Sequence, residues 1–218
     1  MRNRKFTEII AGLVTVAAVM VVFLFSYQLE PRVDRQLHAA IGKTLAKEAL
    51  SLLGQGGQIV LIARDTESFR QPAIDILLQS FKREIARANA SISATQWVQA
   101  DPLRPVEVPP GDFFELIRRS PAEHVIVSLL GPPLLTEEQR NKLGRVKPKI
   151  VAFCSGNLAD KIDLSQLFGA GLLHSAVVNR RVPPEATGNR PTTPKSFEQL
   201  YMTIKAADVP ASSLGAAL

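Results

Sequence analysis

An uninterrupted apolar run occupies residues 9–27, and it contains no charged side chain. A helix of about nineteen residues spans roughly 28 Å, which is close to the thickness of the hydrocarbon core of a bilayer. Three aromatic residues, Phe23, Phe25 and Tyr27, lie near the far end of the run, where aromatic rings favour the membrane interface. The pattern therefore predicts a transmembrane helix over residues 9–27.

A second helical pattern follows a proline at position 31, and it covers residues 28–57 together with a glycine-rich end. Apolar residues at spacings of three and four predict one buried face, formed by Leu37, Ile41, Leu45, Ala49 and Leu52. The segment is interpreted as an amphipathic stalk helix with a glycine hinge. Because the stripe covers little more than two heptads, we expect packing on the next domain or weak self-association through the stalk, and not a coiled coil.

Short apolar runs alternate with helical patterns between residues 58 and 182. The predicted strands cover residues 58–63, 91–98, 124–130, 150–154 and 172–178. The predicted helices cover residues 72–90, 112–119, 136–143 and 164–168. Apolar strands separated by helices are typical of a parallel sheet that is covered on both faces. This domain is predicted to be a three-layer α/β/α sandwich whose five-stranded parallel sheet has the order 2-1-3-4-5, by analogy with other such sheets.

The composition changes at residue 183, and residues 183–218 are predicted to be a proline-rich linker with a short C-terminal segment. Four apolar residues beyond the linker fall at helical spacing and predict a short helix docked back on the domain. These residues are Phe197, Leu200, Tyr201 and Ile204.

Positive charges at Arg2, Arg4 and Lys5 precede the apolar run, which predicts that residues 1–8 stay in the cytoplasm. The remainder of the chain is then extracytoplasmic, or periplasmic in a bacterium. The alternative is a cleaved signal peptide, whose apolar region is usually only about 7–15 residues long and ends in small residues. The longer run here favours an uncleaved signal-anchor, and hence a single-pass membrane protein.

Charge and residue usage exclude several classes of function. The net charge is +6, but aromatic residues make up only 6% of the chain and no basic run is interleaved with them. A nucleic-acid partner is therefore not expected. One cysteine and three dispersed histidines predict no metal site and no disulfide. The absence of a glycine-rich phosphate-binding motif predicts no nucleotide cofactor, so no cofactor is expected.

In an open parallel sheet, ligands collect at the carboxyl ends of the strands. The loops predicted at those ends carry six candidate ligand-binding residues, Arg64, Asp65, Phe69, Gly131, Ser155 and Asn157. Arg64 and Asp65 can bond the hydroxyls of a polyol, and Phe69 can stack on its ring. The alternative is a solvated loop in which Thr66 or Ser68 caps the next helix.

The unit formed by strand 58–63, loop 64–70 and helix 72–90 resembles the first βα unit of type I periplasmic-binding-protein domains. Residues 113–117 followed by 124–128, and residues 146–148 followed by 149–153, fit the later units of that family. The resemblance covers residues 58–180 and implies one lobe of a fold in which two lobes close on a sugar or another small solute. A single lobe implies that capture needs a dimer or an envelope protein partner.

A different resemblance concerns Cys154. Residues 152–156, Ala-Phe-Cys-Ser-Gly, end a predicted strand at a turn and resemble the nucleophile elbow of the PfpI-like and class I glutamine amidotransferase-like fold. That resemblance implies a cysteine-dependent hydrolase or amidase, which needs a histidine to lower the pKa of the thiol. His174 lies at the start of the fifth predicted strand, and this places it at the opposite edge of the sheet.

Three hypotheses follow from the sequence. The leading one is a non-catalytic, membrane-anchored domain that binds a sugar-like solute or an envelope protein. The alternatives are the hydrolase based on Cys154 and a structural envelope component. Trp97 is interpreted as core filling at a strand end, with a stacking platform as its alternative.

Overall fold

The computed structural model describes residues 15–21, 23, 33–66, 71–99, 107–156, 158–180 and 196–208. The chain divides into two compact units, Met1–Val33 and Asp34–Leu218. In the first unit, residues 15–21 and 23 are helical and exposed, and the rest of the predicted membrane span lies outside the described residues. No helix within the described part is both long and apolar enough to cross a membrane.

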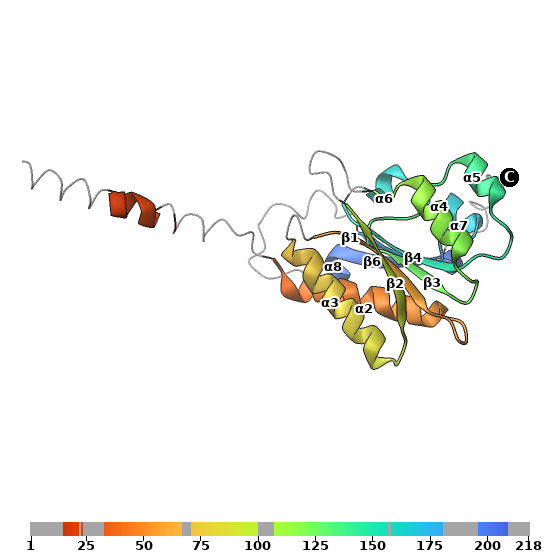
Figure 1. Cartoon of the computed structure of the whole chain (residues 1–218), viewed down its shortest axis with the longest axis horizontal. Helices are drawn as coiled ribbons and strands as arrows, with labels where there is room; N and C mark the ends of the chain where they lie inside the picture. Colours follow the sequence, from red (N-terminus) through yellow and green to blue (C-terminus); the bar gives the residue numbers. More distant parts are fainter. Residues whose placement is uncertain are drawn as a thin grey trace, which may run out of the picture. The chain divides into compact units, whose positions relative to one another are not determined.

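The second unit is built on a six-stranded sheet with the order β2-β1-β3-β4-β5-β6 (Figure 1). Its strands are β1 Ile59–Arg64, β2 Ile92–Val98, β3 Val125–Ser128, β4 Lys149–Cys154, β5 Ser175–Asn179 and β6 Tyr201–Lys205. The first five strands pair in parallel, and β6 pairs with β5 in the antiparallel direction. The predicted parallel order 2-1-3-4-5 is confirmed, and a sixth strand extends it.

Helices cover both faces of the sheet, which confirms the predicted three layers. One face carries α2 Arg35–Leu52, α3 Pro72–Arg87 and α8 Phe197–Leu200 (Figure 1). The other face carries α4 Pro110–Arg119, α5 Glu137–Lys142, α6 Leu158–Lys161 and α7 Leu164–Gly169. A short 3₁₀ helix, Ala206–Asp208, follows β6.

Side chains of β1 alternate between the two hydrophobic clusters. Ile59 and Leu61 pack in the cluster beneath α2 and α3, whereas Val60 and Ile62 pack in the cluster beneath α4 and α7. Successive strand residues point to opposite faces, so a strand that is apolar throughout must be covered on both. This explains why the strands predicted from continuous apolar runs lie in the middle of the sheet.

Helix α2 packs within the domain and is not a free-standing stalk. Ile41 and Leu45 are fully buried in the cluster that includes β1, β3 and β4. Asp34 caps the helix by accepting a hydrogen bond from the backbone N–H of Leu37 at 3.0 Å. Of the two alternatives for this segment, packing on the domain is the one observed, and the compact unit begins at Asp34.

The predicted helical stripe over residues 197–204 is wrong for its second half. Only Phe197–Leu200 is helical, and Tyr201–Lys205 forms strand β6. The free edge of β5 offers backbone hydrogen-bond partners to this segment, and β6 pairs with it. Tyrosine, threonine and isoleucine favour strands over helices, so the pairing prevails over the helical spacing. The segment does dock on the domain as predicted, since the Tyr201 ring lies 5.8 Å from that of Phe153.

A buried carboxylate ties β6 to the helical layer. Glu48 of α2 is almost fully buried, accepts a hydrogen bond from the Ser175 hydroxyl at 3.0 Å, and pairs with the Lys205 ammonium group at 3.0 Å. Removing one partner of such a group leaves a buried charge uncompensated. This network therefore fixes α2, β5 and β6 in one register.

The contact between α2 and α3 makes a specific prediction for Gly42. A Cβ at this position would lie 2.3 Å from the Leu77 carbonyl oxygen, so Gly42→Ala must push the two helices apart. We expect a loss of about 1–3 kcal/mol in the free energy of unfolding, as in other overpacked cores. Urea denaturation followed by circular dichroism measures it.

Gly111 of α4 provides the matched control, because a Cβ there would meet nothing within 4 Å. Gly111→Ala should be neutral or stabilising by up to about 1 kcal/mol, because alanine favours helix. Equal effects of the two substitutions would contradict the close packing of α2 on α3.

Candidate functional site

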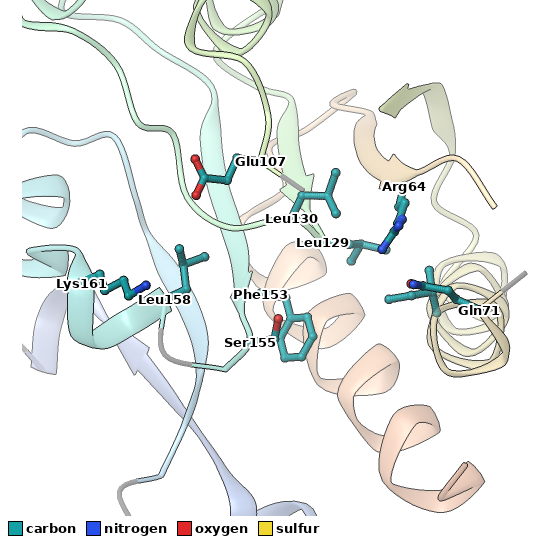
Figure 2. Close-up of a pocket in the computed structure, with 10 residues that line it drawn as sticks. Arg64, Gln71, Glu107, Leu129, Leu130, Phe153, Ser155, Leu158 and Lys161 are labelled. Carbon is teal, nitrogen blue, oxygen red and sulfur yellow. The ribbon is translucent and has the colours of Figure 1, made fainter. Parts of the chain in front are cut away.

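A cleft of about 390 Å³ lies at the carboxyl ends of β1, β3 and β4. Its walls come from the end of β1, the start of α3, the segment after β3, the end of β4 and helix α6 (Figure 2). Ten residues line it: Arg64, Gln71, Ile74, Glu107, Leu129, Leu130, Phe153, Ser155, Leu158 and Lys161. The position agrees with the general rule for open parallel sheets.

Hydrogen-bond donors and acceptors border an apolar centre. In Figure 2, Phe153 and Ser155 lie between Lys161 on one side and Arg64 on the other. Arg64 and Lys161 supply cationic donors, and Glu107 supplies an acceptor. An arrangement of this kind can bond several hydroxyl groups while an aromatic or aliphatic wall contacts the carbon skeleton.

Arg64 is the most informative of these groups. It is the last residue of β1 and is half-buried, and its Nε atom is inaccessible to solvent without a hydrogen-bond partner among the described residues. A buried donor that lacks a partner costs about 1–3 kcal/mol. The residue as a whole lines the cleft, so its terminal guanidinium nitrogens are the groups that can donate to a ligand oxygen.

The six predicted site residues have different positions. Arg64 and Ser155 line the same cleft. Gly131 is not among the lining residues; its φ of +98° favours glycine, and a Cβ on it would lie 2.6 Å from the side chain of Leu158, which does line the cleft. Asp65 is not among the lining residues, and its backbone N–H donates to the Val98 carbonyl at 2.9 Å. The remaining two, Phe69 and Asn157, lie outside the described residues.

Several lining residues were not predicted. Leu158 and Lys161 belong to α6, a helix of one turn whose sequence carries no periodic signal. Glu107 lies in the connection from β2 to α4, where the rule for strand ends could have identified it. Phe153 belongs to a strand, and its apolar character alone does not distinguish a cleft wall from a core residue.

The environment of Cys154 does not activate its thiol. The side chain is fully buried in the cluster beneath α4 and α7, and this burial raises the pKa of the thiol to about 12. His174 lies near the start of β4, where its Nδ1 accepts from the backbone N–H of Ile150 at 3.2 Å. Cys154 is the last residue of the same strand, so the two side chains lie at opposite ends of β4.

Thiol labelling tests this description of Cys154. Because the thiolate is the reactive form, a pKa of about 12 predicts that iodoacetamide leaves the folded protein unmodified from pH 7 to pH 9. Unfolding in guanidinium should restore complete labelling within minutes, as measured by mass spectrometry. Rapid alkylation of the native protein would instead support the hydrolase hypothesis.

His174 predicts an acid-side loss of stability. Burial, followed by the charges of Lys149 and Lys147, lowers its pKa from 6.5 to about 4. Between these values the unfolded chain binds more protons than the folded one, so this histidine destabilises the fold as the pH falls from 6.5 towards 4. Urea unfolding of the wild type and of His174→Gln across this range measures the effect, and the variant should show the shallower pH dependence. Parallel curves would contradict a buried neutral imidazole.

No protein-family model matches the sequence, and no curated protein matches it either. Solved structures are similar in fold. One is a periplasmic ribose ABC transporter protein from Conexibacter woesei DSM 14684, with 13% identity and a TM-score of 0.44 over 65% of this chain and 45% of that one. Another is an ABC transporter solute-binding protein from Burkholderia graminis C4D1M in complex with D-arabinose, with 18% identity and a TM-score of 0.43 over 65% and 47%.

A third is the periplasmic component of an ABC-type sugar transport system from Hahella chejuensis, with 14% identity and a TM-score of 0.45 over 67% of this chain and 50% of that one. The chain thus spans about half the length of these structures. The likeness is one of fold, and at that level it agrees with the resemblance stated from the sequence. The domain is similar in fold to type I periplasmic-binding-protein-like domains.

Proposed function

We propose that this chain is a membrane-tethered, extracytoplasmic domain that binds a small sugar-like solute in the cleft at the carboxyl ends of β1, β3 and β4. The observation that carries the proposal is the cleft itself, which brings the charged side chains of Arg64, Glu107 and Lys161 around an apolar centre. A concave site with a few converging polar groups around an apolar surface is the arrangement expected of a small-molecule site.

The size and lining of the cleft favour a polyol. Its volume of about 390 Å³ falls in the range of roughly 300–1,000 Å³ typical of small-molecule sites. Arg64 and Lys161 can donate to hydroxyl oxygens, and the Glu107 carboxylate can accept from a hydroxyl. Phe153 offers an apolar surface for the C–H groups of a sugar ring.

The cleft that the described residues line is partly open to solvent. A ligand that is half exposed keeps much of its hydration and binds weakly. The proposal therefore includes a second surface, supplied by an envelope protein partner or by a second copy of the chain, for tight capture.

The tether is supported by the N-terminal sequence. The uncharged run over residues 9–27 has the length of a membrane span, and the basic residues at 2, 4 and 5 favour a cytoplasmic N-terminus. With that orientation, the compact unit that begins at Asp34 is extracytoplasmic.

A sugar panel tested by thermal unfolding of the detergent-solubilised chain examines solute binding, with ribose and D-arabinose as the first compounds. A ligand at about ten times its Kd stabilises the folded state by about 1.4 kcal/mol. For a chain of this length we expect the Tm to rise by about 3–6 °C.

Arg64→Gln should weaken binding by about 10- to 100-fold, because a hydrogen bond from a charged donor contributes about 1.5–3 kcal/mol. Arg145→Gln, an exposed residue at the opposite edge of the sheet, is the matched control and should bind as the wild type does. No shift with any sugar at millimolar concentration would reject the solute and leave the envelope partner as the function to test.

A further inference from the structure

Trp97 lies at the surface, contrary to its interpretation as core filling. It belongs to β2, the edge strand of the sheet, and 47% of its surface is exposed. The ammonium group of Lys82 on α3 lies 5.8 Å from the centre of its ring. An exposed tryptophan beside a lysine has the composition of a membrane-interface contact, where the ring sits among headgroups and the ammonium meets phosphates.

A shallow hollow of about 520 Å³ reaches the same lysine. Arg35, the first residue of α2, lines one side, and residues of α3 that include Asp75, Ile76 and Lys82 line the other. The cationic groups of Arg35 and Lys82 thus lie beside partly buried aliphatic side chains. A phospholipid headgroup with the first carbons of its acyl chains presents the complementary chemistry.

Basic residues make up half of the exposed positions of α2 and α3, the two helices that form this part of the domain. The exposed basic side chains of α2 and α3 are Arg35, Lys43, Lys47, Lys82, Arg83 and Arg87. Three carboxylates lie on the same helices: Glu84 pairs with Arg87 at 2.7 Å, Glu48 is buried against Lys205, and the exposed Asp75 accepts a hydrogen bond from the Thr66 hydroxyl at 3.2 Å. This layer therefore carries a positive field that attracts anionic lipid.

The chain enters the domain at this surface. Asp34 caps α2 directly before Arg35, and the predicted membrane span ends at residue 27. The connecting residues 28–33 can bridge at most about 20 Å, even when fully extended. The beginning of α2 therefore stays within a short distance of the bilayer if the apolar run is embedded in it.

We propose that Arg35, Lys82 and Trp97, together with the exposed lysines and arginines of α2 and α3, form a basic–aromatic surface that lies on an anionic lipid bilayer. The inference rests on the membrane tether of the proposed function and is independent of which solute the cleft binds. Lipid is favoured over a protein because an exposed tryptophan beside cationic side chains matches the headgroup region of an anionic bilayer, and the proposed tether would keep such a bilayer within reach.

The single tryptophan of the chain makes a direct test possible, since its fluorescence reports on Trp97 alone. The full chain is reconstituted in nanodiscs of phosphatidylcholine with phosphatidylglycerol, with or without bromine on the upper acyl carbons. An interfacial ring lies within about 5–10 Å of the headgroup–acyl boundary, so bromolipid should remove about half of the emission. The emission should also move to shorter wavelength relative to detergent solution.

Two double variants distinguish the contribution of this surface to the quenching from a general effect of net charge. Arg35→Gln with Lys82→Gln should reduce the quenching in anionic nanodiscs towards the level seen in pure phosphatidylcholine. Arg119→Gln with Arg145→Gln removes two exposed charges from other elements of the domain and should leave the quenching unchanged.

The outcomes are distinguishable from those of the solute proposal. If the chain copurifies with nanodiscs but bromolipid leaves the emission unchanged, the basic–aromatic surface does not contact lipid and the inference is overturned. If the chain fails to enter nanodiscs, the tether is wrong and the inference falls with it. Equal quenching in both double variants would likewise reject a role of Arg35 and Lys82 in lipid contact. The sugar titration is unaffected by any of these results.

Discussion

A parallel sheet that is apolar on both faces must be covered on both, and the rest of this domain depends on that constraint. The side chains of β1 enter two separate clusters, one under each helical layer. Helix α3 cannot cover the first face alone, because the buried residues of β3 and β4 also point into it. Helix α2 supplies the missing cover, which is why a segment that precedes the first strand is part of the domain. The absence of a side chain at Gly42 allows the two helices to approach closely enough to do this.

The same constraint determines where chemistry can lie. Polar side chains are excluded from the middle of the buried strands β1, β3, β4 and β5, since a buried polar group without a partner is costly. They appear where the strands leave the core, as Arg64 does at the end of β1 and Ser155 does after β4. Because the carboxyl ends of all five parallel strands lie on the same side of the domain, these residues meet in one cleft although they are far apart in sequence.

Much of this arrangement could be predicted from the sequence, because its causes are local. The apolar runs of β1, β3, β4 and β5 identify the strands, and the helices between them require parallel pairing. Strand β6 was missed because Phe197, Tyr201 and Ile204 fit a helical spacing, while the β5 edge that selects a strand exists only in the folded domain. For the same reason the pairing of Glu48 with Lys205, more than 150 positions apart, has no local signal. Arg64 and Ser155 were found by a rule about strand ends, whereas Lys161 depends on a one-turn helix that no periodicity reveals.

The first turn of α3 connects the cleft with the basic–aromatic surface. Gln71 and Ile74 line the cleft, and Pro72 and Asp75 line the hollow beside Arg35. Residues three apart share one side of a helix, so these two pairs face different neighbours from the same turn. One side of this turn therefore borders the cleft, and the other side borders the hollow beside the first residue of α2.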